Sequence, residues 1–242
     1  MTEQTFELEC GCTMKIGITI DVSGQCCTGG GGGAFTPSDI PDLAAWYDLS
    51  DETSVTYDGG TFAISQVDDL SGNGVHLTNA GSNQPKYSVA NGYMYTDGND
   101  GFTMPLSIPE EYTIVLKAKY TDLSGGSANA LVGIPGSFNA LIGMHGGTNF
   151  RVYSTGVNVA AATTDEVFIA AAYGAEGVTS SSWLDETEYT GTRGAHGTVS
   201  NLSFFAGKGN CTAGARIYQA AVYNRTLTEN EISQLRDHFN GV

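Results

Sequence analysis

The feature that most limits what this chain can fold into is a succession of short β-type segments separated by glycine-rich turns. The segments are rich in Thr, Val, Ile, Tyr and Phe, and turns such as Asp97–Gly101 and Ser124–Gly126 lie between them. Regular short strands with such turns predict an all-β sandwich or barrel. The expected strands are Gly92–Asp97, Tyr112–Thr121, Asn129–Ile134, Ala140–Met144, Phe150–Ser154, Val167–Tyr173, Thr179–Thr187, Leu202–Ala206 and Ala215–Tyr223.

The charge of the chain excludes some classes of partner. Ten Lys and Arg against 26 Asp and Glu give a net charge of −16. Binding to nucleic-acid phosphates or to anionic lipid needs clustered cations, so we expect neither partner. No apolar stretch approaches the roughly 18 residues of a membrane helix, so no membrane insertion is expected. The first residues are acidic and lack an apolar region, so we also expect no secretory signal peptide.

A run of five glycines, Gly29–Gly33, divides the chain. Such a run does not hold one backbone conformation by itself and is typical of a flexible linker. We therefore predict an N-terminal arm over residues 1–28, a linker over 29–35 and one body domain over 36–242.

The arm has the pattern of a β-hairpin. From Met14 to Val22 apolar and polar residues alternate, as in a half-buried strand, and Phe6–Cys10 form a shorter strand with the same period. An isolated hairpin is marginal in water, so its apolar face must pack on the body, on sister subunits or on another protein. The residues expected at this docking face are Met14, Ile16, Ile18, Ile20, Val22, Cys10, Cys12, Cys26 and Cys27.

The cysteines leave three readings open. Four of the five lie in the arm and the fifth is Cys211. The arm cysteines could bind a soft metal such as zinc, form disulfides or inter-subunit crosslinks, or remain small buried thiols. The odd number and the missing signal peptide weaken the disulfide interpretation.

The C-terminal segment predicts a helix. Thr228 and Glu231 have the spacing of a capping box, and Gly241 is placed to end the helix. Ile232, Leu235 and Phe239 follow as one apolar stripe.

Three blocks of sequence resemble the concanavalin A-like lectin/glucanase superfamily, and specifically its laminin-G-like jelly rolls. They are Ile40–Asp48 with Val67–Gly74, then Tyr95–Pro105 with Tyr112–Val115, and finally Ala215–Ile232. The third is the most specific, because a strand, a turn and a capped helix must occur in that order. The resemblance implies an antiparallel two-sheet jelly-roll sandwich with a short C-terminal helix against one end. Domains of this style are found in phage virion proteins that decorate heads or form fibres.

Some members of this superfamily are glycoside hydrolases, which place several acids on one face of a strand. The nearest candidate here is Asp185–Glu188, in which Glu186 and Glu188 share a face but no third acid has the required offset. Asp185 more closely resembles the Asp of the hairpin turn in these domains. We therefore predict that the chain is not an enzyme and has no catalytic residues.

Two kinds of binding site are predicted from the resemblance. Many relatives hold one calcium ion at a rim, and Asp97, Asn99 and Asp100 could supply its oxygens, although the same residues also favour a turn. No other cofactor is expected. Glycan binding needs exposed aromatic side chains, and the candidates, none of which forms a known sugar motif, are Tyr87, Tyr93, Tyr95, Trp183 and Tyr189.

The function expected from these observations is that of a virion structural protein, a capsid decoration or head fibre. The arm would anchor to the major capsid or tail proteins, and the jelly roll would project outward and adhere to host-surface glycans. The chain would be made in the host cytoplasm, act at the virion surface and form a homo-oligomer. The alternatives are a free carbohydrate-binding lectin and a glycoside hydrolase.

Overall fold

The computed structural model divides into two compact units, Met1–Phe35 and Thr36–Val242. In the first unit, β1 (Gln4–Glu7) pairs antiparallel with β2 (Thr13–Ile16), which confirms the predicted hairpin. Among the residues predicted to dock, Ile18, Ile20, Val22 and the four arm cysteines lie outside the described residues, so their part in docking stays a prediction. The described residues are 4–7, 13–16, 34–96, 98, 100–123, 129–134, 142–145, 149–152, 157–192, 199–205, 211 and 214–241.

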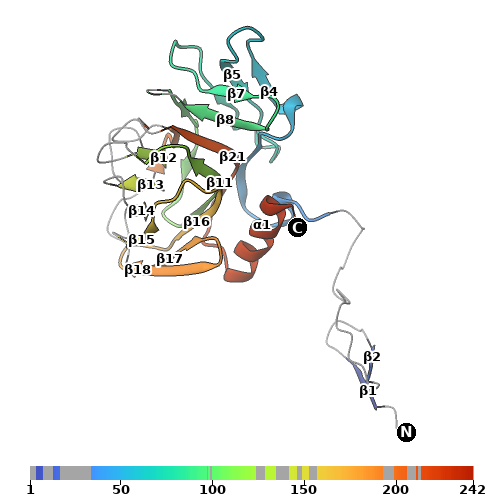
Figure 1. The fold of residues 1–242 in the computed structure, drawn as a ribbon. Coiled ribbons are helices and arrows are strands. Elements are labelled where there is room, and N and C mark those ends of the chain that lie inside the picture. Colours follow the sequence, from blue (N-terminus) through green and yellow to red (C-terminus); the bar gives the residue numbers. More distant parts are fainter. Residues whose placement is uncertain are drawn as a thin grey trace. The chain divides into compact units, whose positions relative to one another are not determined.

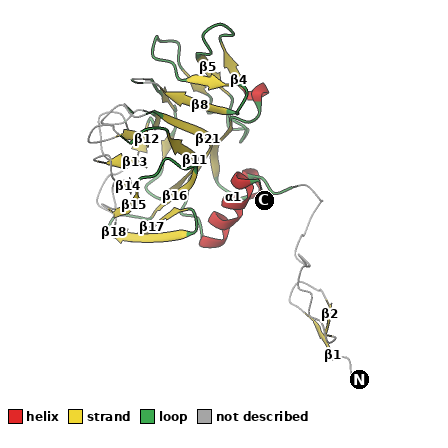
Figure 2. Ribbon diagram, viewed as in Figure 1, coloured by secondary structure: helices red, strands yellow, loops and turns green. Residues whose placement is uncertain are grey.

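The second unit is a sandwich of two antiparallel sheets, as Figures 1 and 2 show. The eight-stranded sheet has the order β18 (Thr187–Thr192), β17 (Thr179–Leu184), β16 (Val167–Tyr173), β11 (Tyr112–Tyr120), β21 (Ala215–Tyr223), β8 (Tyr93–Thr96) and β7 (Lys86–Ser88), with β3 (Leu43–Asp48) also paired to β21. The nine-stranded sheet has the order β15 (Val157–Ala161), β14 (Asn149–Val152), β13 (Ile142–His145), β12 (Asn129–Gly133), β20 (Ser203–Phe204), β9 (Phe102–Thr103), β6 (Leu77–Thr78), β5 (Ile64–Val67) and β4 (Val55–Tyr57). The predicted all-β jelly-roll sandwich is therefore confirmed.

The remaining elements are short, apart from one helix. β10 (Ser107–Ile108) pairs with β19 (Val199–Ser200), and two 3-10 turns, η1 (Pro37–Asp39) and η2 (Glu52–Ser54), flank β3. The helix α1 spans Glu229–Asn240. In the described part of the chain no helix has the length and apolar character needed to cross a membrane.

The two sheets bury one hydrophobic core between them. In β11 and β21 alternate side chains, such as Leu116 and Ile217, are fully buried in this core with Phe204 of the facing sheet. The intervening side chains, such as Lys117 and Arg216, point to the outer face of the eight-stranded sheet. Burial of one face of each strand accounts for the alternation in the sequence and provides the main stabilising term.

Helix α1 covers part of that outer face. Thr228 accepts a hydrogen bond from the backbone N–H of Glu231, and the Glu231 carboxylate accepts one from the N–H of Thr228, so the predicted capping box is present. Gly241 ends the helix with a φ of 73°, a left-handed conformation that glycine adopts without strain. Phe239 packs edge-on against Phe168 of β16 with ring centroids 6.0 Å apart, so the helix covers the outer face of the sheet at β16.

A buried aspartate, Asp69, holds the loop that follows β5 in place through its hydrogen bonds. One Asp69 oxygen accepts hydrogen bonds from the backbone N–H groups of Trp46 (3.0 Å) and Ser71 (2.9 Å), and the other accepts from the Ser71 hydroxyl (2.8 Å) and the Val75 N–H (3.0 Å). Burial raises the pKa of Asp69, but these hydrogen bonds outweigh it, so the pKa lies below its ordinary value. Asn73 donates to the Leu43 carbonyl (2.8 Å), so this loop fastens β3 and is structural.

Candidate functional site

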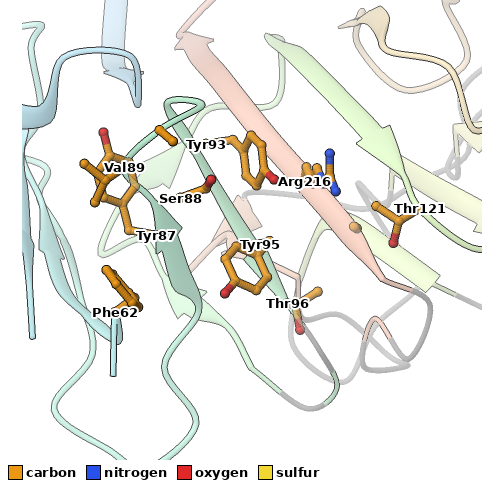
Figure 3. A pocket seen from close by; sticks show the side chains of 11 residues that line it. Phe62, Tyr87, Ser88, Val89, Tyr93, Tyr95, Thr96, Thr121 and Arg216 are labelled. Atoms are coloured by element: carbon orange, nitrogen blue, oxygen red, sulfur yellow. The ribbon is translucent and has the colours of Figure 1, made fainter. Parts of the chain in front are cut away.

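A groove of about 600 Å³ lies near the β7 edge of the eight-stranded sheet. Figure 3 shows Tyr93 and Tyr95 of β8 beside it, with Arg216 of the neighbouring strand β21. An isolated bridge between Ala63 and Lys86 brings the loop before β5 against β7, so Phe62 closes one side. The lining residues are Phe62, Tyr87, Ser88, Val89, Ala90, Tyr93, Tyr95, Thr96, Thr121, Ala215 and Arg216.

The alternation of β8 directs two tyrosines into this groove. Met94 is fully buried in the core, so its neighbours Tyr93 and Tyr95 point to the opposite, outer face. Their rings meet edge-on with centroids 6.1 Å apart, and the Arg216 guanidinium carbon lies 4.6 Å from the centroid of the Tyr93 ring. Tyr218 of β21 packs edge-on against Tyr93 with ring centroids 5.3 Å apart. These contacts hold an apolar platform and a cation side by side.

Tyr87 contributes to the floor of the groove. Its side chain is only 2% exposed, and its hydroxyl donates a hydrogen bond to the Leu49 carbonyl at 2.7 Å. Burial, with smaller contributions from nearby acids that include Glu52, raises the pKa of Tyr87 to about 12. The hydroxyl is therefore neutral and already used, whereas Phe62 (43% exposed) and Val89 (40% exposed) offer open apolar surface at the rim.

The structure separates the predicted aromatic residues into two groups. Trp183 and Tyr189 lie on β17 and β18, at the opposite edge of the sheet from β7 and β8 (Figure 1). Trp183 is 5% exposed beside a smaller hollow of about 340 Å³ against α1, and Tyr189 packs against the core. The structure thus brings Tyr87, Tyr93 and Tyr95 together, but not Trp183 and Tyr189.

The candidate catalytic acids lie in the turn between β17 and β18 and at the start of β18. Asp185 adopts a φ of 52°, and its carboxylate accepts a hydrogen bond from the Phe168 N–H at 2.9 Å. Glu186 follows it in the turn between β17 and β18. Glu188 lies in β18, where it is paired with Trp183 of β17. Asp185 therefore shapes this turn, as the resemblance implies.

The predicted calcium site falls mostly outside the described residues. Asp97 and Asn99 are not among them, and the Asp100 carboxylate lies 3.5 Å from the Thr96 hydroxyl, which donates to it. Within the described ranges, no three His, Cys, Asp or Glu side chains form a group that could hold a metal ion. The calcium site stays a prediction.

Sequence reasoning missed Arg216 and Phe62. Arg216 could have been noted as an outward residue of its strand, because it lies between the apolar Ala215 and Ile217. Nothing in the sequence pairs it with Tyr95, however, since that pairing is a cross-strand register between segments far apart in the chain.

Comparison with known proteins gives matches of fold only. No protein-family model matches the sequence, and no curated protein matches it. Among solved structures, the Trypanosoma rangeli sialidase matches with a TM-score of 0.58 and 17% identity over 83% of this chain and 33% of the sialidase. The binding domain of Paraclostridial Mosquitocidal Protein 1 matches with a TM-score of 0.60 and 13% identity over 84% of this chain and 53% of that domain. The receptor-binding domain of botulinum neurotoxin type G matches with a TM-score of 0.56 and 13% identity over 82% of this chain and 51% of that domain.

These matches are consistent with the concanavalin A-like fold expected from the sequence. The chain spans about a third of the length of the sialidase and about half the length of the two toxin domains. The structures named above lend no support to a phage origin.

The matches also correct one prediction. The prediction that the chain is not an enzyme is wrong in excluding enzymatic activity, because the matched structures with this fold include sialidases, which are enzymes. At 13–17% identity the likeness shows the fold alone.

Proposed function

We propose that the body of this protein binds a carbohydrate in the groove formed by Tyr93, Tyr95 and Arg216. The observation that supports this most is the placement of two tyrosine rings and a guanidinium group on an outer sheet face beside a 600 Å³ hollow. Sugar rings have apolar faces that pack on aromatic rings and hydroxyl rims that need hydrogen-bond partners. An aromatic platform next to a fixed donor suits both.

The roles within the groove follow from its geometry. The ring of Tyr95, which is half-buried, would pack against the apolar face of one sugar unit. Arg216, whose guanidinium carries several N–H donors in a planar fork, would donate to ring or substituent oxygens. Ser88 and Thr121 line the same hollow, and their hydroxyls would serve as further polar contacts.

The matched structures support this proposal by analogy. One structure of the Trypanosoma rangeli sialidase is in complex with sialic acid, and two matched toxin domains are named for binding, one of them for binding a receptor. Fold alone does not transfer a ligand, so the argument rests on the groove itself.

A glycan microarray with the full-length protein tests the proposal. We expect Tyr95→Ala to weaken binding of any bound glycan about tenfold, since it removes the packing platform. Tyr189→Ala is the matched control, because it removes a tyrosine from the opposite edge of the same sheet. Absence of glycan binding, or equal losses in both variants, would contradict the proposal. The same glycans are to be assayed for released sugar, because sialidases share the fold.

We further propose that residues 1–28 attach the chain to a virion, so that the body is displayed at the virion surface. The support is the β1–β2 pair in a unit of its own, the five glycines after it, and a net charge of −16 that favours solubility at high copy number. The partners would be capsid or tail proteins and further copies of this chain.

Deletion of residues 1–33 tests this second proposal. We expect the full chain to co-sediment with purified virions and the deletion variant to remain in the supernatant. Both should retain the same affinity for a bound glycan. Co-sedimentation of the deletion variant would contradict an anchoring role for the arm.

A further inference from the structure

The register of the eight-stranded sheet places cations in one lateral row across the groove. Lys119 of β11 is paired with Arg216 of β21, Arg216 with Tyr95 of β8, and Tyr95 with Lys86 of β7. All four alternate with buried residues along their strands and therefore share the outer face. Side chains directly opposite one another on adjacent strands are close neighbours, so the row is contiguous.

This row concentrates positive charge in a protein that has little of it. The chain has ten Lys and Arg against 26 Asp and Glu, and three of the ten cations are Lys86, Lys119 and Arg216. An anion is repelled by most of such a surface. It is attracted where cations gather beside a hollow that focuses their field.

Lys119 and Arg216, on the inner strands β11 and β21, differ in their contacts from the neighbouring Lys117. Within the described part of the chain, neither Lys119 nor Arg216 forms an ion pair with an acid. The neighbouring Lys117 differs, because its ammonium lies 3.0 Å from the Glu166 carboxylate and donates to the Phe239 carbonyl at 2.8 Å. Lys117 therefore holds the end of the helix. The Arg216 guanidinium instead lies against the Tyr93 ring and hydrogen-bonds to the Tyr218 side chain, which also interacts with Glu166. Lys119 is the direct neighbour of Arg216 in register on the same outer face.

A simpler explanation for surface lysines in a sheet does not account for this row. Charged residues on edge strands prevent unwanted pairing with other chains, and Lys86 on the edge strand β7 fits that role. Lys119 and Arg216, however, lie on β11 and β21, which have partners on both sides. No edge needs protection there.

We infer that the groove selects an acidic glycan, in which a sugar unit bears a carboxylate or a sulfate group. The inference rests on the proposed carbohydrate-binding function and specifies its ligand class. The ring of Tyr95 contacts the sugar, and the anionic substituent lies against Arg216, with Lys119 next along the row. Charge-assisted hydrogen bonds from a guanidinium to a planar carboxylate or to sulfate oxygens are stronger than those to neutral hydroxyls.

The experiment compares glycans in matched pairs on one array, using the full-length protein. Each neutral glycan is printed beside its sialylated, uronic-acid-bearing and sulfated counterparts, and binding is measured at 50 and 500 mM NaCl. We expect the acidic members to bind at least about tenfold more tightly at low salt, and the difference to shrink at high salt as the charges are screened. The carboxylated and sulfated members distinguish the two sources of negative charge.

Charge-neutralising variants locate the effect. Arg216→Gln is expected to weaken binding of the acidic member about tenfold, and Lys119→Gln about two- to fivefold, with little change for a neutral glycan. Arg236→Gln removes one positive charge at the other edge of the sheet and controls for net charge. Thermal melting of each variant confirms that it is folded, and Lys119→Gln keeps the test decisive if Arg216→Gln unfolds.

The outcomes separate this inference from the function on which it rests. Binding of neutral and acidic members with equal affinity, or equal losses in Arg236→Gln and Arg216→Gln, would overturn the selection of acidic glycans but leave carbohydrate binding intact. Absence of binding to every glycan would instead overturn both.

Discussion

The two ends of the eight-stranded sheet use the same strand pattern for different purposes. At one end, Phe168 of β16 points to the outer face and is 1% exposed, because Phe239 of α1 packs on it. At the other end, Tyr95 of β8 also points to the outer face but lines an open groove. An outward aromatic residue thus becomes core or binding surface according to what the chain folds over it.

The covered end is fastened by polar contacts as well as by packing. The Arg225 guanidinium forms two hydrogen bonds with the Glu231 carboxylate, at 3.0 and 2.5 Å, just before and within the first turn of α1. Lys117 holds the last turn through the Phe239 carbonyl. The groove end has no such cover, so its substitutions should affect binding more than stability.

The largest effect on stability is expected from Phe239→Ala. This change removes a buried ring from the contact with Phe168 and leaves a cavity, which costs about 3–4 kcal/mol of the free energy of unfolding. Urea denaturation of both proteins measures it. A loss below about 1 kcal/mol would show that the Phe239 ring contributes little to the covered end. A loss of glycan affinity in the folded variant would show that the two ends are not independent.

A smaller effect that depends on pH is expected from Glu231→Gln. Hydrogen bonds from Arg225 lower the pKa of Glu231 most, burial opposes them and Thr228 adds to them, so the pKa falls from 4.5 to about 2. The carboxylate therefore stabilises the fold fully above about pH 4.5, and this contribution is lost as the pH falls towards 2. We expect the variant to be less stable by about 2 kcal/mol at pH 7.

Thermal melting as a function of pH checks this prediction. The curves of the wild-type protein and Glu231→Gln should converge near pH 2. Asp58, whose pKa is lowered by hydrogen bonds from the Thr61 hydroxyl and from backbone N–H groups, lies in an exposed turn before β5. Asp58→Asn is the control for a carboxylate away from the helix, and a constant gap between wild type and Glu231→Gln at all pH values would contradict the assignment.

A modest effect is expected from Tyr87→Phe at the floor of the groove. The change removes the hydrogen bond from the hydroxyl to the Leu49 carbonyl and leaves the ring in place, which costs about 1 kcal/mol. Affinity for a bound glycan should not change, because the hydroxyl faces the core. A selective loss of affinity without a loss of stability would instead make Tyr87 a ligand contact.

The smallest effect on stability is expected from Tyr95→Ala. Its ring lies on the uncovered face, so the free energy of unfolding should change by less than about 0.5 kcal/mol while glycan affinity falls. Guanidinium denaturation monitored by tryptophan fluorescence measures the first quantity. A destabilisation comparable to that of Phe239→Ala would show that the ring is part of the core, and would break the contrast between the two ends.

Much of the fold could be predicted from local patterns. The capping box of Thr228 and Glu231 and the stripe that follows it specify α1, since both depend on residues within a few positions of one another. The alternation around Met94 likewise determines that Tyr93 and Tyr95 share a face. The candidate glycan residues on β8 were therefore accessible to sequence reasoning, whereas Trp183 and Tyr189 were grouped with them only by residue type.

The sequence by itself determined which elements form and which side chains share a strand face, because hydrogen bonding and burial impose periods of 2 and 3.6 on local patterns. Only the tertiary structure decided which strands are neighbours, and hence that Lys119, Arg216 and Tyr95 form one row beside the groove. It also decided that α1 covers β16 and not β8. Those outcomes depend on contacts between residues far apart in the chain, where the packing of the whole sandwich selects the register and no local pattern specifies it.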